Sequence, residues 1–229
     1  MLFDGVPARI QPQPAGMPLI PEKGETSMCL NRRERGNAFI EFVLVASFFF
    51  VPIVLGLVTV GISVIRSQQV TQLTRDVGHM LAKGVDFSQQ GNQNMVVNDL
   101  ANGLSLQANA GNVTGSSTGN GVLVLSTFEN LTATCDCPNA GHTVVVDRIV
   151  IGNNTLYQSG FGNPAYIDPT SGQVANYSSD AGAIADNLSS VISLPAGGLA
   201  FMCEGDFAFN DLGVAGYMTK LGAFNRAVF

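Results

Sequence analysis

The sequence predicts an α+β protein, in which a long N-terminal helix crosses a membrane and continues as a stalk into a small mixed domain. A run of 24 residues from Phe42 to Ile65 carries no charged side chain, in a chain of 229 residues that is 46% hydrophobic and 12% charged. Apolar residues then recur at helical spacing, and after residue 85 short apolar runs alternate with stretches rich in Gly, Asn, Ser and Thr. These observations divide the chain into an N-terminal segment at 1–36, a helix at 37–84, and a domain at 85–229 with an antiparallel sheet and one or two short helices.

The apolar run is long enough to cross a bilayer as a helix, which takes about 20 residues. Arg32, Arg33 and Arg35 precede the run, whereas Arg66 is the single basic residue among the eight that follow it. This excess of positive charge on the N-terminal side predicts a single-pass span with a cytoplasmic N-terminus and an exported domain. A secretory signal peptide is the alternative, but its apolar part would be only about 7–15 residues long.

An acidic residue, Glu41, lies at the start of the apolar region. A carboxylate at the centre of a membrane costs about 2.5–3.5 kcal/mol on insertion scales, so such a residue usually has a partner. The residues around it, "RGNAFIEF" at 35–42, resemble the processing site of type IV pilin-like proteins. They are most similar to the TadE-like pseudopilins of the tight-adherence (Flp/Tad) pilus system. The segment "TQLTRDVGHMLAKGVDFS" at 71–88 also resembles the stretch that follows the membrane helix in that group.

The resemblance covers residues 32–88. It implies that a prepilin peptidase cleaves between Gly36 and Asn37, and that Glu41 and Phe42 take part in assembly. The implied partners are membrane lipid, the peptidase, other pilin or pseudopilin subunits and the pilus assembly platform. The implied location is the bacterial inner membrane, with the C-terminal domain periplasmic or extracellular and the subunit incorporated in a pilus after assembly.

Cleavage would also give Glu41 a partner. It would create an α-amino group at Asn37, cationic at neutral pH, about one helix turn before the carboxylate. Inside an apolar helix bundle, pairing of the amine with the carboxylate of its own or a neighbouring chain is worth more than in water. The alternative is that Glu41 extends to the head groups at the membrane edge.

The segment before the cleavage site is long for a leader. Five prolines lie between Pro7 and Pro21, a composition typical of a disordered or untranslated segment. Met28 is an alternative start, which would give the nine-residue basic leader "MCLNRRERG".

The helix is expected to continue beyond Arg66 and to end at Lys83 and Gly84, because a cation favours the C-terminal dipole and a glycine accepts a left-handed cap. Strands are predicted at 122–128, 142–152 and 199–209, the first two as antiparallel neighbours, with short helices at 95–106 and 180–192 and a flexible loop at 108–121. The apolar stripe of the stalk consists of Val70, Leu73, Val77, Met80 and Leu81.

Three cysteines, Cys135, Cys137 and Cys203, fall in the exported and therefore oxidising part, while Cys29 falls in the N-terminal segment. Strain disfavours a bond within the Cys-Asp-Cys motif, so a disulfide between Cys203 and one of the pair is expected. It would close a loop of more than 60 residues and stabilise the domain by about 4 kcal/mol in the chain-entropy model. The alternative is a zinc site that adds His142 to the three cysteines, although C-x-C is not the usual ligand spacing.

Other functional classes find little support in the sequence. Neither His79 nor His142 has a Ser or Cys nucleophile and an acid in a recognisable arrangement, so no enzyme is expected. The region after Gly36 carries 13 acidic and 6 basic residues, and its net charge of −7 argues against nucleic acid as a partner. The acidic cluster of Glu204, Asp206 and Asp211 is interpreted as a solvated surface, with a calcium site as the alternative. No cofactor or metal is expected.

The sequence therefore predicts a structural protein, a pseudopilin or minor pilin that is cleaved by a prepilin peptidase and takes part in assembly of a type IV or Tad-like pilus. The alternative is an uncleaved single-pass anchor that holds a binding or adhesion module outside the membrane. The two hypotheses differ in the N-terminal residue of the mature protein.

Overall fold

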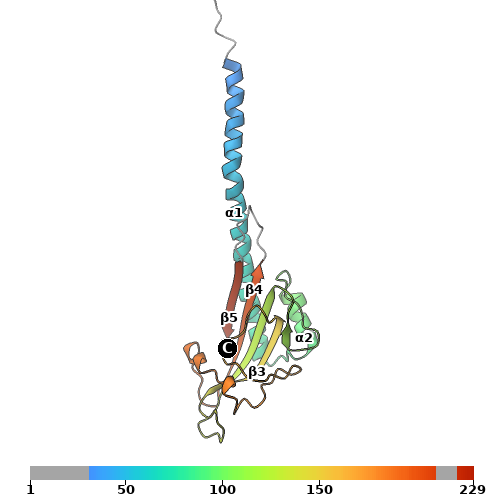
Figure 1. The fold of residues 1–229 in the computed structure, drawn as a ribbon, viewed down its shortest axis with the longest axis vertical. Helices are drawn as coiled ribbons and strands as arrows, with labels where there is room; N and C mark the ends of the chain where they lie inside the picture. The colour runs from blue at the N-terminus through green and yellow to red at the C-terminus, as the bar shows by residue number, and fades with distance from the viewer. Residues whose placement is uncertain (1–30, 210–220) are drawn as a thin grey trace, which may run out of the picture. The chain divides into compact units, whose positions relative to one another are not determined.

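The computed structural model describes residues 31–209 and 221–229, without the side chains of 31–37 and 221. The chain forms two compact units that divide between Val51 and Pro52. Helix α1, Asn31–Ala82, leads into a domain with one sheet and a few short helices, so the predicted α+β class is confirmed (Figure 1).

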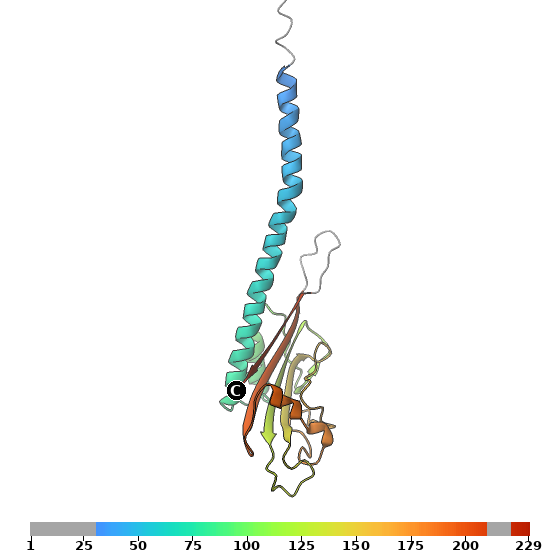
Figure 2. The same ribbon diagram turned by 90° about the vertical axis from the view of Figure 1, so that its left-hand side faces the viewer.

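The C-terminal part of α1 packs on the sheet through the predicted stripe. Val70, Leu73, Val77 and Leu81 are buried, at spacings of three and four residues that place them on one helix face. Figure 2 shows this part of α1 running along one face of the sheet. The helix ends one residue before the predicted end, and Gly84 adopts a φ of 83°, the left-handed conformation that closes a helix C-terminus.

The sheet has the strand order β1-β3-β2-β4-β5. All neighbours are antiparallel except β1 and β3, which are parallel. The predicted antiparallel pairing of the strands around 122–128 and 142–152 is confirmed, since β2 and β3 are neighbours. The strands are β1 Thr114–Ser116, β2 Gly121–Asn130, β3 Thr143–Asn153, β4 Leu199–Phe209 and β5 Leu221–Val228.

The sheet has a hydrophobic core on each face, because successive side chains of a strand point to opposite sides. Leu123, Leu125 and Cys203 belong to the core between the sheet and α1, which we call the helix-side core. Phe128 and Met202 belong to the core on the opposite face, which we call the outer core. The outer core is covered by the long connection between β3 and β4.

The short helices differ from the expected ones. A helix predicted at 95–106 is found as α2, Gln90–Met95, followed by a π-helical turn, η1, Val96–Leu100. The single helix predicted at 180–192 is two 3₁₀ turns, η2 Ala181–Ala183 and η3 Asp186–Ser190. The break has a tertiary cause, because Ile184 forms a bridge with Val144 of β3 and the next residue donates its N–H to the Thr143 carbonyl.

Candidate functional site

The apolar half of α1 is the first candidate site. Within the part of the chain that the structure describes, α1 is the one helix long and apolar enough to cross a membrane, and its most apolar window has a mean hydropathy of 2.7 with none of it buried. Large side chains from Phe39 to Ile65 are exposed, among them Phe42 at 68% and Phe48 at 78%. A face of this kind needs an apolar environment, so the segment can serve as a single membrane anchor.

The sequence-predicted processing and assembly residues all lie at the start of α1. Gly36 and Asn37 are within the helical backbone, and Glu41 and Phe42 have exposed side chains. Residues four apart in a helix lie on one side of it, about 6 Å apart along the axis. The backbone at Asn37 is therefore one turn from Glu41, as pairing after cleavage requires.

The expected disulfide to Cys203 is wrong. Cys135 and Cys137 are bonded to each other, with a Cα–Cα distance of 5.2 Å, and Cys203 is a buried free thiol. Cys203 points into the helix-side core, while Cys137 packs against the outer core. Because the sheet separates the two side chains, no bond can form between them.

The Cys135–Cys137 bond contributes less to the stability of the domain than a bond to Cys203 would have done. In the chain-entropy model a ring spanning so few residues stabilises by only about 1.5 kcal/mol, against about 4 kcal/mol for the loop first expected. Burial in the apolar core raises the pKa of the Cys203 thiol, with the nearby Glu204 contributing, so this residue behaves as a small hydrophobe.

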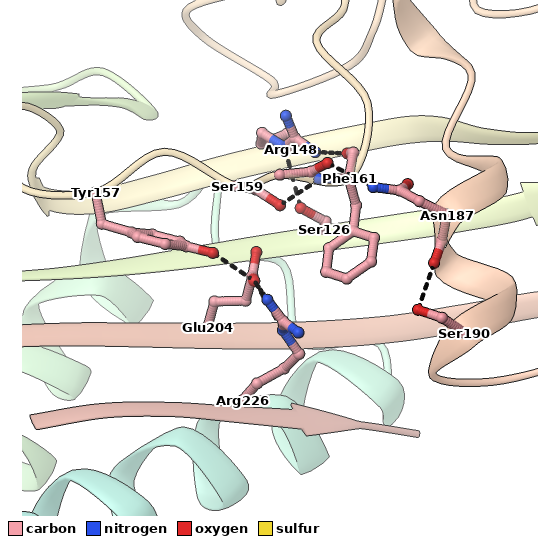
Figure 3. Close-up of polar contacts among 10 residues, drawn as sticks. Ser126, Arg148, Tyr157, Ser159, Phe161, Asn187, Ser190, Glu204 and Arg226 are labelled. Carbon is pink, nitrogen blue, oxygen red and sulfur yellow. Dashed lines mark hydrogen bonds and ion pairs between the residues drawn. The ribbon is translucent and has the colours of Figure 1, made fainter.

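A buried ion pair joins β4 to β5 (Figure 3). The carboxylate of Glu204 is 0% exposed, and a single oxygen, Oε1, makes all of its polar contacts. This oxygen accepts hydrogen bonds from Arg226 Nε at 2.9 Å and from the Tyr157 hydroxyl at 2.8 Å, and Arg226 Nη2 lies 2.8 Å from it in the ion pair. The other oxygen, Oε2, is buried without a partner among the described residues.

A second buried cation lies beside this pair. Arg148 of β3 donates to Ser126 Oγ at 3.1 Å and to the carbonyls of Gly162 and Phe161. Burial lowers the pKa of Arg148, and the Glu204 carboxylate opposes that change. Burial and the bond to Glu204 together raise the pKa of Tyr157, so its hydroxyl remains a donor.

The predicted solvated acidic cluster is therefore wrong for Glu204, which is buried and paired. Asp206 is partly buried, and Asp211 lies outside the described residues. The sequence carried a signal for buried charges here, because Glu204 and the neighbouring Arg148 interrupt apolar strands at positions that should be buried. The partner of Glu204 could not be identified, since Arg226 lies in a strand that was not predicted. The Glu204 carboxylate is closed to solvent, and its contacts with Arg226 and Tyr157 link β4 to β5 and to the loop after β3.

Asp147 of β3 is a third partly buried acid, located where β3 bulges against β2. Its Oδ1 is buried without a partner among the described residues. Burial raises its pKa from 3.8 to about 6; the Arg148 N–H opposes the change and Asp86 adds to it. Between pH 3.8 and about 6 the folded state therefore binds more protons than the unfolded state. The free energy of unfolding is highest below this window, and it falls as the pH rises through it.

We expect Asp147→Asn to stabilise the protein at pH 8, by about 1–2 kcal/mol once partial exposure is allowed for. The gain should disappear at pH 4, where the wild-type carboxyl is already mostly neutral. Urea unfolding of the full chain in detergent micelles at both pH values measures the difference. An equal effect of the substitution at both pH values would show that the carboxyl does not titrate in this window.

The two histidines have separate partners. His142 Nδ1 lies 2.7 Å from Asp186 Oδ2 at the surface, and His79 packs against the Phe229 ring with centroids 4.2 Å apart. In the ranges 31–209 and 221–229, no three His, Cys, Asp or Glu side chains lie together as metal ligands. The alternative zinc set of Cys135, Cys137, His142 and Cys203 is therefore not assembled.

Comparisons of this chain with protein families, with curated proteins and with solved structures find no match. Its function is therefore inferred from its own residues. Those residues form an exposed apolar segment of α1 with a single acid, Glu41, a buried ion pair and a disulfide-bonded loop.

Proposed function

We propose that this chain is a pilin-like subunit, a TadE-like pseudopilin or minor pilin, that a prepilin peptidase cleaves between Gly36 and Asn37 before assembly. One observation carries the proposal: the exposed apolar segment of α1 has a single acid, Glu41, and it lies one turn after the Gly36–Asn37 bond. An acid at this point needs a cation, and cleavage of that bond supplies one.

The two parts of α1 differ in burial, and this difference supports the proposal. From Val70 onward the helix buries its apolar stripe against its own domain. The large side chains before Arg66 find no cover within the described chain, with Phe39 at 69% and Leu57 at 69% exposed. That segment is therefore free to exchange lipid contacts for contacts with like helices, as a subunit moving from membrane to filament must do.

Electrostatics supports pairing at Glu41. Two unit charges about 4 Å apart attract by about 1 kcal/mol in bulk water and by several times more in a partly apolar site. The gain from pairing is thus largest inside a bundle of helices, and the neutralised pair is easier to remove from the membrane edge. The acid thereby favours assembled over unassembled subunits.

The proposed location is the bacterial inner membrane, crossed once, with the arginines at 32–35 on the cytoplasmic side and the domain exported. The proposed partners are membrane lipid, the prepilin peptidase, other pilin-like subunits and the assembly platform. The acidic charge of the exported part gives no reason to include nucleic acid.

Co-expression with a prepilin peptidase tests the cleavage step. Intact mass of the membrane-extracted chain should lose every residue up to Gly36, whereas Gly36→Leu should keep its leader. Cleavage elsewhere, or an unchanged mass of the wild type with a peptidase active on a control substrate, would favour the uncleaved single-pass anchor.

A further inference from the structure

The loop between β2 and β3 holds the Cys135–Cys137 disulfide at the surface. Both cysteines are partly exposed, and Asp136 between them is exposed, as are Thr134 before them and Pro138 after them. An external thiolate can therefore reach the sulfur atoms without unfolding of the domain.

The loop is held in place by hydrogen bonds that do not involve the sulfurs. The Asn139 side chain, itself buried, donates to the carbonyls of Tyr177 at 2.8 Å and Asp180 at 2.9 Å. The backbone of Leu131 exchanges bonds with the other end of the loop, donating to the His142 carbonyl and accepting from the Gly141 N–H. These contacts fix both ends of the loop on each side of the disulfide, so they persist when the bond opens.

The ring itself spans a single intervening residue. Closing so short a loop removes little entropy from the unfolded chain, so the disulfide contributes little to the stability of the whole domain. This disulfide is accessible, closes a short ring and is not needed to hold its loop in place. Such a disulfide is better suited to thiol–disulfide exchange than to stabilising a fold.

Within residues 31–209 and 221–229, the one other cysteine, Cys203, cannot reach the pair. Cys203 is 0% exposed, lies in the helix-side core and is separated from the loop by the sheet. Burial raises its pKa and so disfavours its thiolate. A mixed disulfide formed at the loop is therefore resolved by a second thiol of the external reagent or by the other cysteine of the pair, and not by Cys203.

We propose that the Cys-Asp-Cys loop is a thiol–disulfide exchange site, which an external dithiol such as the paired thiols of a partner protein opens, and which the disulfide form of that partner closes by the reverse reaction, while the domain stays folded. One external thiolate attacks a loop sulfur, forming a mixed disulfide and releasing the other loop sulfur as a thiolate. The second external thiol attacks the mixed disulfide and releases the second loop sulfur. The loop gains two electrons and two protons, and the external dithiol becomes a disulfide.

Reduction of the full chain carrying Cys29→Ser, in detergent micelles with dithiothreitol, followed by alkylation and intact mass, tests the site with Cys203 as an internal reference; every further variant carries the same Cys29→Ser substitution. The folded protein should take two labels quickly and a third, at Cys203, only in denaturant. Cys203→Ala should also take two, and the double variant Cys135→Ser/Cys137→Ser none. No labelling before denaturant is added, or labelling of all three thiols together, would overturn the proposal.

Two further measurements separate exchange from simple accessibility. The thermal midpoints of the oxidised and reduced forms should differ by only a few degrees, and the loop should be part oxidised and part reduced across glutathione buffers. A loop that stays oxidised at every glutathione ratio, or a domain that melts on reduction, would mark a structural disulfide. The chemistry does not depend on cleavage at Gly36.

Discussion

Replacing Arg226 with alanine is expected to lower the free energy of unfolding by about 3–5 kcal/mol, the usual cost of leaving a buried charge without its partner. Glu204 is 0% exposed, and two nitrogens of this guanidinium lie 2.8 and 2.9 Å from its Oε1. The Tyr157 hydroxyl also donates to this carboxylate, but it is neutral and cannot compensate the negative charge of Glu204. Urea unfolding of the full chain in detergent micelles measures the loss.

Two companion variants make the Arg226 result specific. Glu204→Leu should cost less than Arg226→Ala, because the Arg226 side chain is 30% exposed and can reach water when unpaired. The double variant Glu204→Leu/Arg226→Met should recover most of the loss, since a buried pair replaced by apolar groups is often neutral. A cost below about 1 kcal/mol for Arg226→Ala, or no recovery in the double variant, would contradict the buried ion pair.

Glu41→Gln is expected to leave cleavage after Gly36 intact and to reduce incorporation into filaments about tenfold or more. A neutral amide cannot compensate the α-amino group at Asn37, and the loss of about 1.4 kcal/mol in pairing already corresponds to a factor of ten. Quantification of the subunit in sheared filament and membrane fractions measures the effect.

Asp99→Asn is the matched control for that experiment. It removes the same charge from an exposed position of η1, outside the apolar segment, and should assemble as the wild type does. Normal assembly of Glu41→Gln would exclude charge pairing as the role of this residue and leave interaction with lipid head groups as its explanation.

The elements with strong local signals were predictable from the sequence. The strand at 199–209 coincides with β4, and the stripe from Val70 to Leu81 is the buried face of α1, because apolar periodicity follows burial on one face. Strand β5, Leu221–Val228, was missed, since Gly, Ala and Asn weaken its local preference. Its antiparallel pairing with β4 stabilises the strand conformation that its local sequence does not favour.

The prediction for 180–192 failed because a tertiary contact overrides a local pattern. Its apolar residues have helical spacing, yet the bridge between Ile184 and Val144 takes the chain out of the helical path. β1 could not be predicted for a similar reason, since its three residues lie in a Gly- and Ser-rich stretch and become a strand only beside β3.

The candidate sites also differ in whether a local sequence pattern or a tertiary contact defines them. The residues from Gly36 to Phe42 could be proposed as a site from the sequence because a short contiguous motif contains them, and their role stays a prediction. The cysteine pairing was not, because it depends on which face of β4 Cys203 occupies relative to the loop. Sequence spacing indicates which residues are near along the chain, whereas the side of a sheet on which two distant residues lie depends on the register of the strands.

Cleavage and assembly are tested most directly by the N-terminal residue of the protein recovered from its own cells, from both membrane and filament fractions. We expect a chain that begins at Asn37 and is present in the filaments. A protein that keeps the arginines at 32–35 in both fractions would contradict this expectation, and the exposed helix would then be a membrane anchor alone.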